Sequence, residues 1–203
     1  MEKIKLGISS CLLGKNVRYD GGHKLDSILK DSLGKYVEYV PVCPEFECGL
    51  GVPRKSMRLE GEPDSLRLII TETRQDVTKR MVNWAQKRVI QLEKEDIRGF
   101  IFKTDSPSCG IKKVKVFNEK NMLVDAGVGI FAQIFMKHFP SLPVQDEENL
   151  HDSGLRENFI VKLQFNETQI LQAERSNICQ LNYPTCEAKW DYIKKAIFRN
   201  KVR

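Results

Sequence analysis

Along the first 145 residues, short apolar runs typical of strands alternate with stretches in which apolar residues recur at helical spacing. Short apolar or β-branched runs predict strands at residues 3–9, 36–42, 66–71, 97–103, 114–117 and 142–144. Apolar residues at helical spacing predict helices at residues 25–33, 73–93 and 127–138. Strands that alternate with helices are typical of an α/β fold. We therefore predict a mostly parallel sheet flanked by helices.

The helix predicted at 73–93 has the clearest apolar face, which consists of Val77, Met81, Trp84, Ala85, Val89 and Leu92. Thr73, followed three residues later by Asp76, resembles a capping box and predicts that the helix begins at Thr73. Residues 46–61 contain glycines and a proline and predict a long irregular loop.

The composition of the sequence changes after Val144. Residues 145–152 are acidic and polar, which indicates a linker, and residues 155–203 contain few large apolar side chains. We predict one domain over residues 1–145, then a linker and a short helical C-terminal extension over residues 146–203.

Composition narrows the class of protein. The chain has 203 residues and no apolar run near the roughly 20 residues that span a bilayer. The run before Cys11, from Leu6 to Ile8, is also too short for a signal peptide, so we expect a cytoplasmic protein with reduced thiols. Lysine and arginine exceed the acids by 33 to 27, which fits an anionic ligand or RNA, although a solvated basic surface is the commoner explanation.

Three cysteines each stand in a short motif that follows a predicted strand. The motifs read S-S-C-L-L-G around Cys11, P-V-C-P-E around Cys43 and S-P-S-C-G around Cys109. Ligands of open parallel sheets bind outside the carboxyl ends of the strands. The fold class therefore predicts that these three thiols converge, although about a hundred residues separate the first from the last.

Thiolates bind zinc, copper(I) or iron–sulfur clusters. Structural zinc sites usually pair ligands two to four residues apart, and only Cys43 and Cys48 form such a pair, a weak one. Three isolated cysteines suit a cuboidal cluster better, and its fourth iron would be open to a substrate. Unrelated structural cysteines are the alternative, and Cys48 is either a fourth ligand or part of the loop lining. Cys179 and Cys186 fit no zinc pattern.

Polar residues beside the cysteines are candidates for catalysis and substrate binding. Glu45 is tied to Cys43 through Pro44, so its carboxylate is expected near the same centre as a general acid or base. Ser106 and Ser108 could orient a substrate or relay a proton, or they could cap a helix after Gly110. Four further candidates for substrate contact adjoin the motifs: Ser10, Arg18, His23 and Lys103.

The three motifs in this order, with D-A-G-V-G at 125–129, resemble the family known as domain of unknown function 523. Its characterised members are thiouracil desulfidases, and the resemblance covers residues 3–144. It implies a [4Fe-4S] cluster held by Cys11, Cys43 and Cys109. It also implies that sulfur is taken from a thiolated uracil, uridine or nucleotide and leaves as sulfide. By the same resemblance, Glu45 is expected to transfer protons and Ser108 to position the substrate.

The segment L-R-E-N-F-I at 155–160 resembles the start of a second domain, domain of unknown function 1722, that is often fused to the first. Fused members are associated with desulfidation of 4-thiouridine in RNA, but this chain ends long before such a domain is complete. Three alternatives therefore stay open: a non-catalytic metal or redox module, a desulfidase of tRNA, and a cluster enzyme that adds sulfur to a nucleoside. The sequence indicates no oligomeric state.

Overall fold

The structure is a computed structural model that describes residues 3–62, 65–118, 120 and 122–164. Its strands are β1 (Ile4–Ser9), β2 (Val37–Val42), β3 (Met57–Glu60), β4 (Arg67–Ile70), β5 (Phe100–Phe102), β6 (Val114–Phe117), β7 (Leu123–Gly127) and β8 (Val144–Asp146). Its α-helices are α1 (Ser27–Ser32), α2 (Thr78–Lys94), α3 (Ile130–His138) and α4 (Ser153–Gln164). Short helical turns are η1 (Ser10–Leu13), η2 (Leu33–Lys35), η3 (Phe46–Leu50) and η5 (Asn149–His151).

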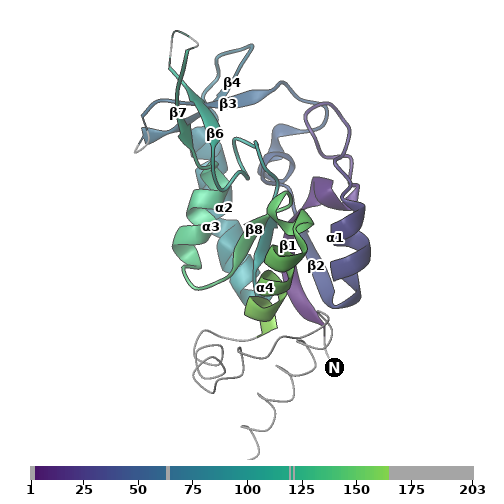
Figure 1. The fold of residues 1–203 in the computed structure, drawn as a ribbon. Helices are drawn as coiled ribbons and strands as arrows, with labels where there is room; N and C mark the ends of the chain where they lie inside the picture. Colours follow the sequence, from purple (N-terminus) through teal and green to yellow (C-terminus); the bar gives the residue numbers. More distant parts are fainter. Residues whose placement is uncertain (1–2, 63–64, 119, 121, 165–203) are drawn as a thin grey trace, which may run out of the picture.

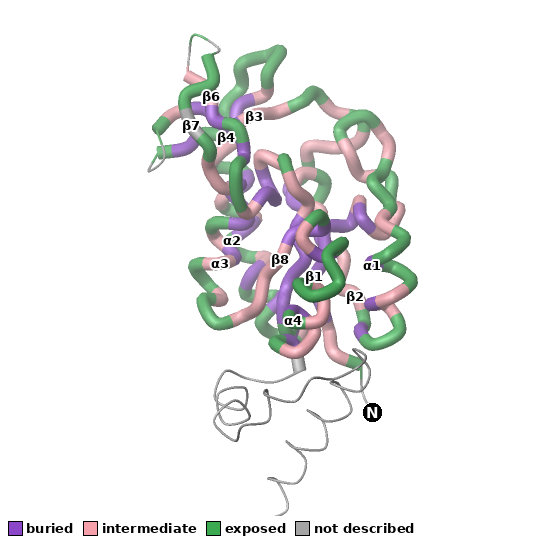
Figure 2. The backbone as a smooth tube through the Cα atoms, viewed as in Figure 1, coloured by how far each residue is buried: buried purple, intermediate pink, exposed green. Residues whose placement is uncertain are grey.

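The central sheet has the strand order β2-β1-β5-β8, and all its neighbouring strands are parallel. Helices α2 and α3 cover one face, while α1 and α4 cover the other (Figure 1). Buried residues follow β1 through the middle of the molecule, and exposed ones lie on the outer surfaces of the helices (Figure 2). This arrangement confirms the predicted α/β fold with a parallel sheet between helices.

Alternate residues of the central strands face the two cores. Phe100 and Phe102 pack with α2 and α3, whereas Ile101 between them packs with α1 and α4. The ring of Phe100 lies over Gly7 of β1, where an added Cβ would be 2.2 Å from Phe100 Cδ2. Only glycine leaves room for that ring at the centre of the sheet.

A second sheet, with the strand order β4-β3-β6-β7, lies above the first (Figure 1). Its inner face packs on α2 and α3 through Leu59, Leu68 and Val116. This sheet was not foreseen, because residues 46–61 were expected to form an irregular loop. They contain η3 and β3 instead, and β7 was missed as well. Both strands are only four or five residues long, which gives too few alternations to stand out.

Several predicted boundaries need correction. Helix α2 begins at Thr78 and not at Thr73, so the predicted capping box is wrong. Asp76 accepts a hydrogen bond from the Thr78 backbone N–H at 2.8 Å and pairs with Ile69 in an isolated β-bridge. Helix α3 likewise starts later than predicted, at Ile130.

The expected linker at 145–152 is wrong in its first part, because β8 continues through Asp146. Leu150, Phe159 and Leu163 then join the core under α1 and β1, so the chain packs on the central sheet as far as Leu163. The division into 1–145 and 146–203 stays a prediction, because most of the second part, including Cys179 and Cys186, lies outside the described residues. Among the residues described, no helix is long and apolar enough to cross a membrane.

Glu60 is a fully buried carboxylate on β3 that accepts hydrogen bonds from Arg74 Nη2 at 2.8 Å and Arg58 Nε at 2.7 Å. The hydrogen bonds of Arg74, and then those of Arg58, lower the pKa of Glu60 below its ordinary range. A lowered folded-state pKa stabilises the fold above the unfolded value, about 4.3, and this stabilisation is lost as the pH falls through the folded-state pKa.

Glu60→Gln is therefore expected to lower the free energy of unfolding at pH 7 by about 1–3 kcal/mol and to flatten its acid dependence. Urea unfolding at pH 7 and pH 3 measures both effects. Glu72→Gln is the matched control, because Glu72 and its partner Lys55 are 63% and 61% exposed. Its effect should stay below about 1 kcal/mol. Equal losses in the two variants would contradict the role given to Glu60.

Candidate metal centre

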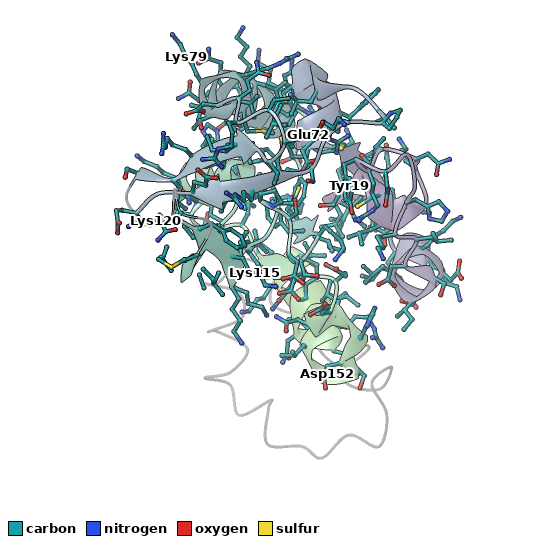
Figure 3. All side chains as sticks on the ribbon, turned by 90° about the horizontal axis from the view of Figure 1, so that it is seen from above. Tyr19, Glu72, Lys79, Lys115, Lys120 and Asp152 are labelled. Carbon is teal, nitrogen blue, oxygen red and sulfur yellow. The ribbon has the colours of Figure 1, made fainter. Side chains whose placement is uncertain are left out.

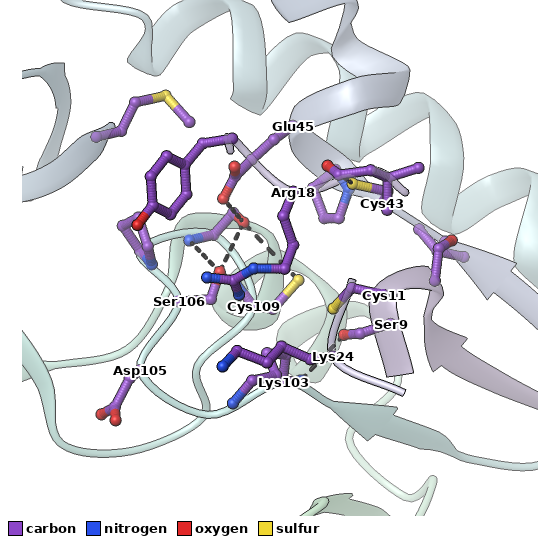
Figure 4. A pocket seen from close by; sticks show the side chains of 18 of the residues that line it. Ser9, Cys11, Arg18, Lys24, Cys43, Glu45, Lys103, Asp105, Ser106 and Cys109 are labelled. Atoms are coloured by element: carbon purple, nitrogen blue, oxygen red, sulfur yellow. Dashed lines mark hydrogen bonds between the residues drawn. The ribbon is translucent and has the colours of Figure 1, made fainter. Parts of the chain in front are cut away.

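A cavity of about 420 Å³ lies at the carboxyl ends of β1, β2 and β5. Turn η1 follows β1 and carries Cys11, Cys43 directly follows β2, and the segment after β5 carries Cys109. Parallel strands end at one edge of their sheet, so segments far apart in the sequence meet there. Figure 4 shows the three cysteines around this cavity.

The three thiols differ in how deeply they are buried and in the charges near them. Cys109 is buried, whereas Cys11 and Cys43 are partly exposed, and all three are free thiols. Burial raises the pKa of each thiol, that of Cys43 to about 11. At Cys11, burial is partly opposed by the positive charges of Lys103 and Arg18. Metals bind thiolates, so binding of a metal centre by these thiols would release their protons.

The spacing of the side chains decides which metal centre fits. Within the described part of the chain, no group of three or more His, Cys, Asp and Glu side chains could hold a metal ion. A structural zinc ion needs four ligands within about 2–2.3 Å of one point. In a [4Fe-4S] cluster each thiolate binds a different iron, so the ligands stand further apart. Three thiols around a cavity of this size therefore fit a multi-iron cluster better than a single ion.

Glu45 is held from two sides at the wall of the cavity. Ser108 Oγ donates a hydrogen bond to Glu45 Oε1 at 2.8 Å, and Arg54 Nε donates to Oε2 at 3.0 Å. The side chains of Arg54 and Glu45 are only 7% and 13% exposed. Arg54 Nη1 also donates to the carbonyls of Val17 and Gly51, which fixes the guanidinium. The carboxylate consequently has one defined orientation, with Oε1 toward Ser108.

The two serines extend this contact into a chain. Ser106 Oγ accepts hydrogen bonds from the backbone N–H groups of Cys109 at 3.0 Å and Ser108 at 3.3 Å. Its own hydroxyl hydrogen can then point to Ser108 Oγ, 3.0 Å away. We assign the direction Ser106 to Ser108 to Glu45 on this basis. The alternative that the serines cap a helix after Gly110 is wrong, because strand β6 follows that segment.

Three positive side chains also line the cavity: Arg18, Lys24 and Lys103. Lys103 forms an ion pair with Glu147, and its Nζ also donates to Thr104 Oγ1 at 2.7 Å. Glu147 is buried and accepts a further hydrogen bond from the Thr104 N–H at 2.9 Å. A residue just after β8, in the segment expected to be a linker, therefore fixes Lys103 at the cavity.

The cavity collects every predicted site residue except His23, namely Ser10, Cys11, Arg18, Cys43, Glu45, Lys103, Ser106, Ser108 and Cys109. His23 is exposed and does not line the cavity, and its Nδ1 accepts the Leu25 N–H at 3.1 Å. Cys48 does not line the cavity either, because its Sγ turns to the carbonyl of Glu45 at 3.5 Å.

Sequence reasoning missed several cavity residues, among them Tyr19, Lys24, Arg54, Met57 and Asp105. The sequence carried no signal for Arg54, because the burial of Glu45, which favours a cation beside it, is known only from the fold. The excess of lysine and arginine over the acids does not by itself locate the cavity, because some of these residues lie elsewhere. In Figure 3, Lys115 and Lys120 lie at the β6–β7 hairpin, apart from Tyr19 at the cavity.

Comparison with known proteins agrees with this geometry. A family model described as 2-thiouracil desulfurase matches residues 6–147. The solved structure of a [4Fe-4S]-dependent thiouracil desulfidase, TudS, superposes with a TM-score of 0.60 at 32% sequence identity, covering 73% of this chain and 94% of that one. The uncharacterized protein YbbK of Bacillus subtilis (strain 168) is 29% identical over 108 residues, which are 51% of this chain and 71% of YbbK.

Proposed function

This chain belongs to the 2-thiouracil desulfurase family, and from that premise we propose that it removes sulfur from a thiolated uracil, uridine or nucleotide with the help of a [4Fe-4S] cluster. The observation that carries the proposal is the cavity itself, which is lined both by thiols from three strand ends and by a carboxylate that is hydrogen-bonded to a serine. The reaction balances without electron transfer: water supplies the oxygen of the new carbonyl, and sulfur leaves as hydrogen sulfide.

Cys11, Cys43 and Cys109 would hold the cluster, because their motifs end three neighbouring strands at one cavity. A cluster with three cysteine ligands supplies a Lewis-acidic iron to which sulfur can bind. Arg18 and Lys103 place positive charge beside Cys11, which favours its thiolate form over the protonated thiol.

Glu45 and Ser108 supply the proton transfers that the reaction requires. Ser108 Oγ can pass its proton to Glu45 Oε1 and take one from an attacking water, because its oxygen lies 2.8 Å from that carboxylate. Arg54 holds Oε2, so that Oε1 stays aimed at the serine during transfer. Ser106 supports the relay by orienting the hydroxyl of Ser108.

The positive side chains bear on which substrate is used. Arg18, Lys24 and Lys103 line the cavity. Glu147 pairs with Lys103, and Asp20 lies 3.6 Å from Arg18 Nε, so part of this positive charge is balanced within the protein. A phosphate group would interact favourably with the remainder. These cations support a nucleotide over a free base among the three substrate forms. Asp105 lines the same cavity and would repel an anion placed next to it, which limits where a phosphate could lie.

One anaerobic experiment tests the proposal. The protein is reconstituted with iron and sulfide, analysed for metal, and mixed in turn with 2-thiouracil, 4-thiouracil, 4-thiouridine and 4-thiouridine 5′-monophosphate. We expect about four irons per chain, loss of the thiocarbonyl absorption and release of one sulfide per base consumed. A colourless protein that holds one zinc overturns the proposal in favour of a structural metal module. Iron uptake with all four compounds untouched also overturns it, and leaves thiolated tRNA and the sulfur-adding direction as the functions to assay.

A further inference from the structure

The D-A-G-V-G segment at 125–129 ends β7 and leads into α3. Its last residue contacts residues 106–110, the loop that carries Cys109 (the cysteine loop). A Cβ added at Gly129 would lie 2.5 Å from the carbonyl carbon of Ser108 and 2.8 Å from the Cys109 nitrogen. Side chains do not come this close to backbone atoms, and a backbone cannot swing aside as the end of a long side chain can. The contact between α3 and the cysteine loop therefore exists only because residue 129 is glycine.

Hydrogen bonds occupy the same contact. Helix α3 has no side-chain N-cap, so its first backbone N–H groups need other acceptors. Carbonyl oxygens of the cysteine loop serve instead: Gly129 N donates to Gly110 O at 2.7 Å, Ile130 N to Pro107 O at 3.1 Å, Phe131 N to Ser108 O at 3.0 Å and Ala132 N to Ser108 O at 3.2 Å. The loop acts as the N-cap of the helix, and the helix in turn fixes the loop.

The helix behind this contact is itself firmly anchored. Phe131 and Phe135 are fully buried and pack edge-on against Phe100 of β5, with ring centroids 5.8 and 4.9 Å apart. Strand β5 leads directly into the cysteine loop, so one aromatic cluster supports both partners of the contact. The loop residues it holds, Ser108 and Cys109, are only 1% and 5% exposed.

We propose that Gly129 is a positioning residue of the metal centre: its lack of a side chain lets the N-terminus of α3 bind the loop and set the directions of the Cys109 thiol and the Ser108 hydroxyl. The inference rests on the proposed function, which gives Cys109 its role as a ligand. The positive end of the helix dipole also faces this loop and favours negative charge on a sulfur there.

The first test uses cluster-free protein and does not depend on catalysis. Gly129→Ala is compared with Gly127→Ala, where the added Cβ meets side chains of Val116 and Leu66 at 3.0 and 3.1 Å and not the cysteine loop. Alkylation by iodoacetamide is followed at each cysteine by mass spectrometry. We expect Cys109 to react at least about tenfold faster in Gly129→Ala only, because the loop opens locally. Buried Cys48 is the internal reference and should react at the parent rate in both variants.

The second test reads the metal centre through its spectrum. After anaerobic reconstitution, Gly129→Ala is expected to retain less than about one-tenth of the parent's iron, in line with the 10–100-fold losses caused by removing supports of metal ligands. Gly127→Ala should load fully and give the parent's electron paramagnetic resonance signal after reduction. A Gly129→Ala protein with parent-like Cys109 alkylation, iron content and signal overturns the inference. A parent that binds no iron overturns the proposed function, while the alkylation contrast still decides the role of Gly129.

If Gly129→Ala does not fold, hydrogen exchange in the parent protein tests whether the N-terminus of α3 is bonded to the cysteine loop. Amides in the first turn of a helix lack partners within the helix and normally exchange fast. Bonding to the loop carbonyls is expected to protect the amides of Ile130 and Phe131 as strongly as those in the middle of α3. Fast exchange at these two amides would overturn the inference.

Discussion

Replacing Cys109 by alanine is expected to abolish both iron uptake and desulfidation. Cys109 is the most deeply buried of the three cavity thiols, and no other cysteine among the described residues stands where it could substitute for it. The loss should exceed about 100-fold, the upper range for residues that merely support a metal ligand. Iron and sulfide analysis after anaerobic reconstitution, together with the turnover of a thiolated pyrimidine, measures the effect.

Cys48→Ala is the matched control for this variant. Cys48 is also a buried free cysteine, but it lies on η3 with its Sγ toward the carbonyl of Glu45 and does not line the cavity. The control should bind iron and turn over substrate as the parent does, with a loss of stability of about 1 kcal/mol. The reverse pattern, with iron kept in Cys109→Ala and lost in Cys48→Ala, would make Cys48 a ligand and contradict the assignment of Cys109.

The convergence of the cysteines was predictable because it follows from the topology of the fold. Apolar strands alternating with helices predicted a parallel sheet, and the structure shows one of four strands, β2-β1-β5-β8. The carboxyl ends of its strands meet at one edge, so Cys11, Cys43 and Cys109 had to approach each other. The family predicted from the three motifs is confirmed by the family model that matches residues 6–147.

The second sheet was not predictable from local pattern. Strand β3 pairs in parallel with β6, more than fifty residues later in the chain, and its four residues alternate too briefly to be recognised. The burial of Glu60 shows the same limit. A charged residue in a short segment is normally expected to be exposed. Glu60 is buried here because Arg58, two residues before it on β3, and Arg74, which follows β4, both bind its carboxylate.

Within the site, sequence reasoning found the residues that lie next to the cysteines and missed those that reach them through space. Glu45 and Ser108 adjoin cysteine motifs, and both line the cavity. Arg54, which binds Glu45, comes from a stretch expected to be an irregular loop. Glu147, which binds Lys103, comes from a stretch expected to be a linker. Such partners complete the charge balance of the site, and only the fold brings them into contact.

The contacts of Glu45 lead to a specific expectation for its replacement. Glu45→Gln keeps the size of the side chain and an oxygen that can accept from Ser108 or Arg54, but it cannot take up a proton. It is expected to lower kcat by about 10²–10⁴-fold, the range for loss of a general acid–base group. Iron content and KM should stay near those of the parent, because Glu45 moves protons and the thiols hold the metal. Steady-state kinetics of the reconstituted variant, with iron analysis of the same sample, separates the two quantities.

Glu47→Gln provides the matched control on the same turn. Glu47 Oε1 accepts the Cys43 N–H at 2.7 Å, and its carboxylate lies 3.5 Å from Arg88 Nε, but it does not line the cavity. A glutamine there retains an acceptor for the Cys43 N–H, so kcat should remain within about threefold of the parent. Equal losses in the two variants would mean that negative charge near Cys43, and not proton transfer, accounts for the effect. A Glu45→Gln protein with the parent's kcat would exclude Glu45 as the proton-transfer group and leave Ser108 and Ser106 without the acceptor that gives their relay its direction.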